Sequence, residues 1–188
     1  MEKKIKVGFD IDGCMNDFHS EMGFLLKRDF NIILPPDEYN WASYIAQVEP
    51  DVQKFWIKYN DEIERRMPIE KCCKVALDQF RKIGCPVNIV TARDYKAAPI
   101  TEHWLNKHKI QYDNIYWSCG DKLDACKWLN VEYMIEDTPP NAILLAENGI
   151  KVLLFEREYN KYVSHPNIIH CENWLAIYEI IADVIKTR

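Results

Sequence analysis

Short apolar runs alternate with longer amphipathic segments along most of this 188-residue chain. A run of four or five mainly apolar residues predicts a buried strand, because a strand covered on both faces carries few polar side chains. Five such strands are predicted, at residues 5–9, 86–90, 114–117, 131–135 and 151–155. Each is short enough to belong to the interior of a sheet rather than to a helix.

Between these strands, apolar residues recur every three or four positions, which predicts helices. The helices are expected at residues 69–83, 100–108, 122–128, 141–148 and 174–186. Gly84 and Gly149 follow two of them, as is common just after the C-terminus of a helix. Strands that alternate with helices form βαβ units, so we expect an α/β fold with a parallel sheet covered on both faces.

The alternation is interrupted after the first strand by a stretch rich in aromatic residues. Helices are predicted there at residues 17–29, 37–48 and 51–66, separated at Pro35-Pro36 and at Pro50. We interpret this stretch as a small helical cap, residues 17–67. The cap is inserted into an α/β core made of residues 1–16 and 68–188.

Polar side chains follow the predicted strands at the points where they end. In chain order these residues are Asp10, Asp12, Thr91, Arg93, the run Cys119-Gly120-Asp121-Lys122, Glu136 and Asp137. Ligands of open α/β sheets bind at the carboxyl ends of the strands. We therefore expect acids, a hydroxyl group and two cationic side chains to meet at one edge of the sheet.

This set of side chains predicts a site for a metal ion and a phosphate. Asp10, Asp12, Glu136 and Asp137 would repel one another unless a cation lay between them. Carboxylate oxygens suit a hard cation, and Mg²⁺ is the expected one. Lysine, arginine and a threonine hydroxyl are suited to hold a phosphate beside it. A carboxylate facing such a phosphate can attack it, as in enzymes that form an aspartyl-phosphate.

Four motifs resemble those of the haloacid dehalogenase-like (HAD) phosphohydrolase superfamily. They are FDIDG at 9–13, NIVTAR at 88–93, the lysine of CGDK at 119–122, and MIEDTP at 134–139. The resemblance covers residues 5 to about 155 and implies a three-layer α/β/α core with a small cap after the first strand.

Within that superfamily the chain most resembles the 5′(3′)-deoxyribonucleotidase (C-type 5′-nucleotidase) family. The first motif continues to Asp17-Phe18, the second ends in Thr-Ala-Arg, and the cap carries the aromatic pair Trp41 and Tyr44. Cys14 and Asn16 depart from the apolar and small residues common at their positions in that family.

The resemblance implies a two-step hydrolysis of a phosphomonoester. Asp10 would attack phosphorus and form an aspartyl-phosphate. Asp12 would protonate the leaving oxygen and later deprotonate water, which requires surroundings that raise its pKa. Mg²⁺ would be held by Asp10, the Asp12 backbone carbonyl and Asp137, with Glu136 assisting. The other expected contacts are Thr91, Ala92 and Lys122 with the phosphate, and Phe18, Trp41, Tyr44 and Arg93 with the rest of the substrate.

The resemblance and the aromatic cap favour a nucleoside or deoxynucleoside monophosphate as substrate. The alternatives left open are a phosphatase for a sugar or cofactor phosphate, a phosphomutase, and a non-catalytic protein that binds nucleotide or phosphate. Binding alone needs no acid at Asp12, which counts against the last. A calcium loop starting at Asp10 is disfavoured, because Met15 stands where that loop needs glycine. For Arg93 a surface salt bridge is the alternative, and for the cap aromatics ordinary packing.

Composition narrows the partners and the compartment. The formal charge of −5, without a long basic run, argues against polymeric nucleic acid, whose binding rests on Lys and Arg neutralising phosphates. No apolar stretch approaches the ~20 residues that cross a bilayer, so no membrane association is expected. Seven cysteines without a CxxC pair predict reduced thiols in a cytoplasmic protein. The sequence leaves a homodimer open.

Overall fold

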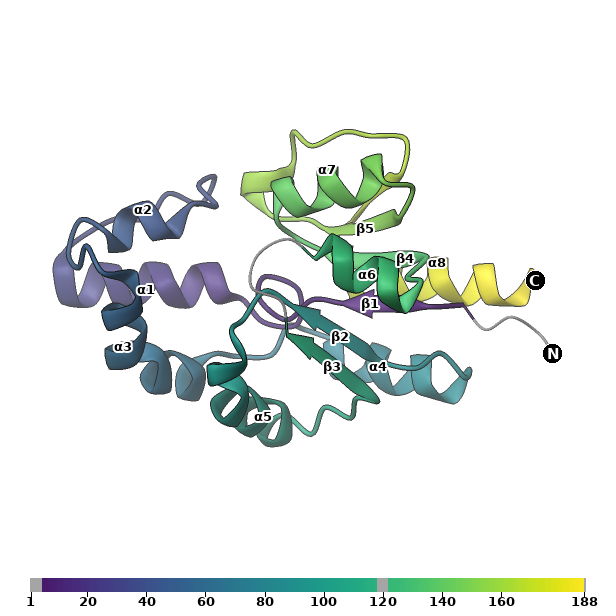
Figure 1. Ribbon diagram of the computed structural model, residues 1–188, viewed down its shortest axis with the longest axis horizontal. Coiled ribbons are helices and arrows are strands. Elements are labelled where there is room, and N and C mark those ends of the chain that lie inside the picture. Colours follow the sequence, from purple (N-terminus) through teal and green to yellow (C-terminus); the bar gives the residue numbers. More distant parts are fainter. Residues whose placement is uncertain (1–4, 118–121, 188) are drawn as a thin grey trace.

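The computed structural model describes residues 5–117 and 122–187. Within them, six parallel strands form one sheet in the order β3-β2-β1-β4-β5-β6 (Figure 1). The strands are β1 (Val7–Phe9), β2 (Asn88–Thr91), β3 (Asn114–Trp117), β4 (Tyr133–Glu136), β5 (Lys151–Phe155) and β6 (Ile168–Cys171). The predicted α/β fold with a parallel sheet is confirmed.

The strand β6 was not predicted from the sequence. It lies at the edge of the sheet, where it pairs only with β5. Of its four residues only Cys171 is buried. Its apolar run is only Ile168-Ile169 before His170, which is shorter than the runs that revealed the other five strands.

The central strand β1 lies where the chain changes direction across the sheet. After β1 the chain adds β2 and then β3 on one side, and it then crosses to β4 on the other side. Phe9 of β1 is in register with Ile89 of β2 and with Ile135 of β4. Such a reversal opens a crevice at the carboxyl ends of the adjacent strands, which is the usual ligand site of this architecture.

Helices cover both faces of the sheet. On one face, α4 (Cys73–Lys82) and α8 (Trp174–Lys186) pack over β1, where the Trp174 ring is stacked 6.3 Å from that of Phe9. α5 (Ala98–Lys107) contributes Trp104 and Leu105 to the same apolar cluster. On the other face, α6 (Leu123–Leu129) and α7 (Pro139–Glu147) build a second cluster. Short 3₁₀ turns η1 (Tyr95–Ala97) and η2 (Glu158–Asn160) complete the core.

Three helices stand apart from the sheet, at the end where its strands point (Figure 1). They are α1 (Phe18–Phe30), α2 (Trp41–Ile45) and α3 (Val52–Arg66). Asp17 and Asp51 cap α1 and α3 by accepting hydrogen bonds from backbone N–H groups of the first turn. These helices correspond to the predicted cap, whose boundaries at residues 17 and 67 stay a prediction.

Two predicted helices begin later than expected. α4 starts at Cys73 rather than at residue 69, because Ile69 forms an antiparallel bridge with Asn16 and Cys72 has a positive φ of 64°. α2 covers only Trp41–Ile45 of the predicted 37–48. The bridge between Asn16 and Ile69 also brings the two ends of the cap segment together.

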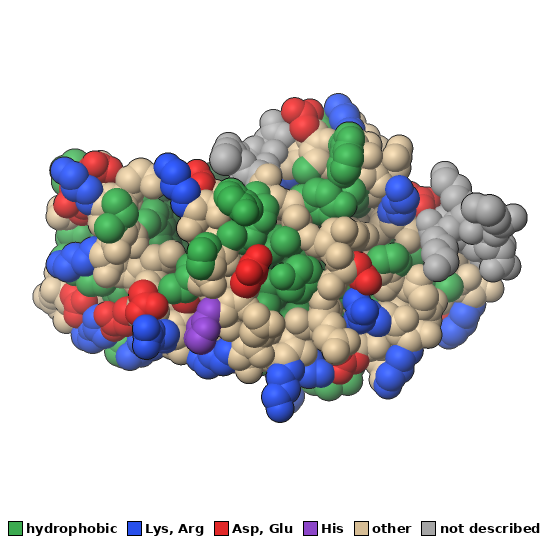
Figure 2. All heavy atoms as spheres, turned by 60° about the horizontal axis from the view of Figure 1, so that its bottom comes forward, with side chains coloured by type: hydrophobic (Ala, Val, Ile, Leu, Met, Phe, Trp, Pro, Cys, Tyr) green, Lys and Arg blue, Asp and Glu red, His purple; other side chains and the backbone are tan. Residues whose placement is uncertain are grey.

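Charged side chains of both signs are interspersed on the face shown in Figure 2, and hydrophobic side chains gather near its middle. This pattern differs from the continuous basic stripe that a nucleic-acid polymer requires. Six cysteines in the described ranges are free, and five of them are buried. None of the helices in these ranges is long and apolar enough to cross a membrane.

Candidate active site

Three of the predicted acids meet where β1 and β4 end. Asp10 follows β1, and its backbone N–H donates to the carbonyl of Ile135 at 3.1 Å, which fixes it beside β4. Glu136 is the last residue of β4, and Asp137 comes next. All three side chains are buried. Carboxylates that lie this close together and are shielded from water need a positive charge near them.

Lys122, which directly precedes α6, supplies that charge. Its ammonium Nζ lies 2.7 Å from Asp10 Oδ2 and 2.7 Å from Glu136 Oε2, and the side chain is 1% exposed. Burial works against its charge, but Asp10 and Glu136 outweigh burial and raise the pKa of Lys122. Lys122 is therefore a buried cation held between two acids, while its predicted contact with the phosphate stays a prediction.

Glu136 has little freedom left for another ligand. While Oε2 accepts from Lys122, Oε1 accepts from the backbone N–H of Thr138 at 3.0 Å and from its hydroxyl at 2.6 Å. Its predicted role as an assisting metal ligand therefore competes with two existing partners. The arrangement makes Glu136 an anchor for Lys122 and for the turn that begins α7.

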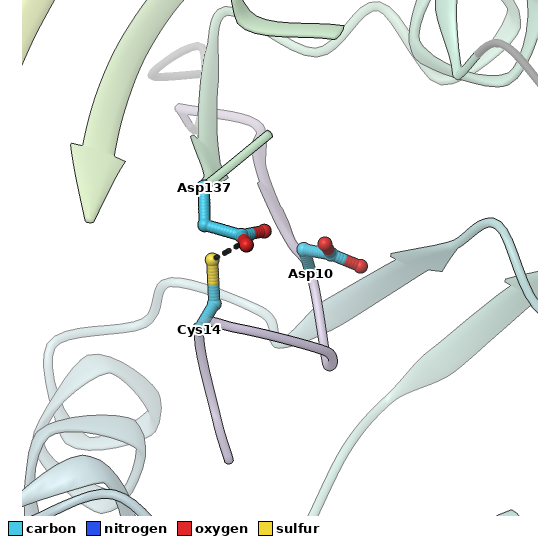
Figure 3. A group of neighbouring side chains, drawn as sticks. All are labelled: Asp10, Cys14 and Asp137. Atoms are coloured by element: carbon cyan, nitrogen blue, oxygen red, sulfur yellow. Dashed lines mark hydrogen bonds between the residues drawn. The ribbon is translucent and has the colours of Figure 1, made fainter. Parts of the chain in front are cut away.

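The remaining acids form a site that suits a hard cation. Asp10, Cys14 and Asp137 offer ligand atoms within 4.8 Å of one another (Figure 3). Burial raises the pKa of Asp10, with Lys122 opposing it, and burial together with Glu136 raises the pKa of Asp137 to about 7. A cation between the two carboxylates would relieve this strain.

Cys14 is the third side chain of this group. Its thiol points at Asp137, with Sγ 3.9 Å from Oδ1 (Figure 3). Burial, reinforced by Asp137 and Asp10, raises the pKa of the Cys14 thiol well above its usual value. The other two donors are carboxylate oxygens, which fit Mg²⁺ or another hard divalent ion.

A segment after β5 holds Asp137 in place through hydrogen bonds, and this segment was not predicted from the sequence. The Tyr159 hydroxyl donates to Asp137 Oδ2 at 2.5 Å, and Asn160 Nδ2 donates to the Asp137 carbonyl at 2.7 Å. Arg157 donates through Nε and Nη2 to the Gly13 carbonyl, at 2.9 and 2.7 Å. The signal was available, because these residues also follow the end of a predicted strand.

Gly13 allows Asp137 to come this close. Its φ is +76°, and a Cβ at this position would lie 1.9 Å from Asp137 Oδ2. Gly84 has the same φ, but nothing lies within 4 Å of the place where its Cβ would be. The two glycines are therefore a matched pair. An alanine would strain the backbone at either position, but its Cβ would collide with a neighbour only at position 13.

Gly13→Ala is expected to lower the free energy of unfolding by clearly more than Gly84→Ala does. Strain in the left-handed region costs about 1–2 kcal/mol in either variant, and the collision with Asp137 adds to it only at position 13. Urea unfolding of both variants measures the difference. Equal losses would mean that the Asp137 carboxylate moves aside without cost, and that its place is not fixed.

Asp12 has a different environment from Asp10. Its carboxylate accepts two hydrogen bonds from Arg93, Nε to Oδ2 at 2.7 Å and Nη2 to Oδ1 at 2.6 Å, and a third from Asn16 Nδ2 at 3.1 Å. Burial raises the pKa of Asp12, but the charge and the hydrogen bonds of Arg93 outweigh it, and the pKa is lowered. The expected raised pKa is therefore wrong for this arrangement.

Arg93 is neither at the surface nor free for a substrate in this arrangement. Its side chain is 10% exposed, and besides Asp12 it contacts Glu64 of α3 and Thr101 of α5 through Nη1, at 2.5 and 2.8 Å. Glu64, which comes from the cap, was not identified from the sequence. Its salt bridge is therefore buried rather than at the surface, and the predicted contact of Arg93 with the substrate stays a prediction.

The phosphate contacts predicted at the end of β2 face the same edge. Thr91, the last residue of β2, is buried, and its hydroxyl accepts from the Arg93 backbone N–H at 3.2 Å. Because Phe9 of β1 is in register with Ile89 of β2, Thr91 lies beside the residues that follow Phe9. Ala92 is exposed. The predicted run Cys119-Gly120-Asp121 lies outside the described residues.

The cap aromatics divide into two groups. The Phe18 ring lies 5.5 Å from that of Trp41 and 5.9 Å from that of Trp56, so these side chains pack together inside the cap. Trp41 also lines a pocket of about 260 Å³ between the cap and the core. Tyr44 does not line this pocket and packs against the main apolar cluster. The other lining residues are Tyr39, Asn40, Ala42, Thr138, Pro140 and Asn141.

Comparisons with known proteins show what the chain is similar to. The family model described as "5' nucleotidase, deoxy (Pyrimidine), cytosolic type C protein" matches residues 3–188. A Clostridium acetobutylicum protein named as a nucleotidase is 28% identical over 182 residues, which cover 95% of this chain and 94% of that protein.

Solved structures show the same fold. A crystal structure of a predicted phosphatase from Clostridium acetobutylicum superposes with a TM-score of 0.71 at 16% identity, covering 96% of this chain and 99% of the other. A HAD-superfamily hydrolase of subfamily IA from Geobacter sulfurreducens superposes with a TM-score of 0.65 at 14% identity, covering 97% and 96%. At these identities the structural likeness speaks for the fold alone.

Proposed function

Since this chain belongs to the 5′ nucleotidase, deoxy (pyrimidine), cytosolic type C family, we propose that it is a Mg²⁺-dependent nucleotidase that acts through an aspartyl-phosphate on Asp10. The chain is a phosphoric monoester hydrolase of the HAD superfamily. The observation that carries the mechanism is Lys122, buried between Asp10 and Glu136 at 2.7 Å from each. A cation in this place favours the ionised form of Asp10 and balances the charge of an arriving phosphate.

In the first step, an Asp10 carboxylate oxygen attacks phosphorus while the bond from phosphorus to the leaving oxygen breaks. In the second step, water attacks the aspartyl-phosphate, which releases phosphate and restores Asp10. Thr91 and Lys122 bind the phosphate oxygens, with the backbone at Ala92. Asp10, the Asp12 carbonyl and Asp137 would hold Mg²⁺, which would supply positive charge to stabilise the transferring phosphoryl group.

Asp12 serves as acid and then as base. Its ionised form, held by Arg93, suits the second step, in which it takes a proton from water. For the first step it must carry a proton to the leaving oxygen. We propose that Asp12 takes up this proton when substrate enters and that Arg93 continues to direct its side chain, which is 30% exposed and so can be reached.

The pocket lined by Trp41 is the proposed place of the nucleobase. It is bounded on the core side by Thr138, the residue that follows Asp137. An indole face on one wall offers stacking, while the amides of Asn40 and Asn141 offer hydrogen bonds to a base edge. Phe18 supports Trp41 from inside the cap rather than touching the base itself.

A phosphatase screen with Mg²⁺ tests the proposal. We expect kcat/KM for nucleoside or deoxynucleoside monophosphates to exceed that for sugar and cofactor phosphates by at least about tenfold. Full chelation of divalent ions should abolish turnover, and added Mg²⁺ should restore it. A preference for a sugar or cofactor phosphate would overturn the nucleotidase assignment and leave the phosphatase. Turnover that survives chelation would overturn the metal requirement.

The cell compartment and partners remain proposals as well. Free, mostly buried thiols support a reducing, cytoplasmic environment. Interspersed surface charge supports a small phosphorylated substrate over a nucleic-acid polymer.

A further inference from the structure

Glu64 is a buried acid in a helix whose other charged residues are mostly exposed. Its side chain is 3% exposed, and Oε2 has no hydrogen-bond partner among the described residues. Burial raises the pKa of Glu64 to about 7, with Arg93 opposing and Asp12 reinforcing the rise. Keeping such a group inside the protein costs stability. The neighbours Arg65 and Glu62 pair with other partners at the surface.

Among the described residues, Glu64 forms a salt bridge with Arg93, the arginine that also holds Asp12. Arg93 directs Nε and Nη2 to Asp12, and directs Nη1 to Glu64 and to Thr101. Because a guanidinium group is planar, fixing Nη1 also fixes the plane and direction of the opposite edge, which faces Asp12. Glu64 and Thr101 thus fix the side of the Arg93 guanidinium that faces away from Asp12, and with it the direction of the N–H groups that bind Asp12.

These contacts join three parts of the molecule at one side chain. Glu64 comes from α3 of the cap, Thr101 from α5 of the core, and Asp12 from the loop after β1. A surface ion pair would be enough to connect the cap to the core. The contact of Glu64 with Arg93 is instead buried, and Arg93 in turn binds Asp12, the residue to which the proposed mechanism assigns the proton transfer.

We propose that Glu64 is a positioning residue of the reaction, which acts through Arg93 to aim the Asp12 carboxylate. The inference rests on the proposed role of Asp12 as acid and base. Through this contact the cap takes part in protonation of the leaving group as well as in covering the substrate.

The test uses two substrates that differ in their need for a proton on the leaving oxygen. The nucleoside part of a nucleoside monophosphate leaves as an alkoxide unless its oxygen is protonated. The leaving group of 4-nitrophenyl phosphate is a phenolate, which is stable without a proton. Glu64→Gln keeps the shape and removes the charge. With Mg²⁺ present, we expect kcat/KM for the nucleotide, which reports the first step and not the shared second step, to fall about 10- to 100-fold. This loss is smaller than the roughly 10²- to 10⁴-fold of a full acid–base contribution, because Asp12 itself remains. The kcat/KM for 4-nitrophenyl phosphate should change less than about threefold, because its leaving oxygen needs no proton.

Three further variants make the result decisive. Glu62→Gln, on the same helix but exposed and paired with Arg28, should leave both substrates unchanged. Thr101→Val removes the other contact to Arg93 Nη1 and should give the same selective loss, smaller in size, even if Glu64→Gln fails to fold. Asp12→Asn is the reference, because an acid that protonates the leaving group must show the same substrate selectivity.

If Glu64→Gln lowered the turnover of both substrates equally, Glu64 would only connect the cap to the core. If it lowered the turnover of neither, Glu64 would have no role in the reaction. Either result would overturn the inference while leaving the proposed function intact. If Asp12→Asn itself affected both substrates equally, the proposed role of Asp12 would fail, and the inference about Glu64 would fail with it.

Discussion

Asp10→Asn is expected to lower kcat on a nucleoside monophosphate by at least about 1,000-fold, because an amide cannot attack phosphorus. Lys122 keeps Glu136 as a partner, so the site retains its cation. The free energy of unfolding should stay within roughly 1 kcal/mol of the wild type. Burial, with the neighbouring acids adding to it and Lys122 opposing it, raises the pKa of Asp10, so the fold gains little from this charge. Steady-state kinetics and urea unfolding measure the two quantities.

The control for this variant is Asp124→Asn, which removes an exposed acid from the first turn of α6. It should retain the turnover of the wild type. If Asp10→Asn hydrolysed nucleotide within about tenfold of the wild-type rate, Asp10 would not be the nucleophile. The reaction would then have to begin with attack by another side chain or by water.

Lys122→Met is expected to lower the free energy of unfolding by about 3 kcal/mol, which is the usual cost of removing one partner from a buried ion pair. The substitution leaves Asp10 and Glu136 buried without the ammonium group that lies 2.7 Å from each. Turnover should be lost as well, since the proposed phosphate site loses its cation. Urea unfolding without divalent ions measures the first effect.

Added Mg²⁺ should return part of the stability of Lys122→Met, because a cation bound by Asp10 and Asp137 reduces the same repulsion. Lys127→Met is the matched control, since Lys127 is exposed on the same helix. It should change the unfolding free energy by less than about 0.5 kcal/mol. A Lys122→Met variant as stable as the wild type would show that the buried acids need no compensating charge.

The carboxyl edge was predictable because its residues are defined locally. Asp10, Thr91, Glu136 and Asp137 each follow a short apolar run, and parallel strands bring such ends together whatever the rest of the fold does. Lys122 was found in the same way, although its complete burial was not. The central strands were predictable for the same reason, and the edge strand β6 was not.

The features that were missed depend on contacts between distant segments. From the sequence, Glu64 belongs to a run of charged residues on an amphipathic helix, which reads as a solvated face. Only the packing of α3 against α5 buries it beside Arg93. Likewise, two neighbouring aspartates predict a raised pKa for Asp12. The lowered pKa follows from Arg93, whose direction is fixed by the tertiary structure.

The central claim is that Asp10 carries the phosphoryl group during turnover. Borohydride reduces an acyl phosphate to an alcohol but leaves a free carboxylate unchanged. Enzyme turning over nucleotide with Mg²⁺ should therefore be quenched with borohydride, digested and analysed by peptide mass spectrometry. The account predicts reduction of the side chain at Asp10, and none without substrate. No reduction in the presence of substrate, or reduction at Asp12 or Asp137 in place of Asp10, would contradict it.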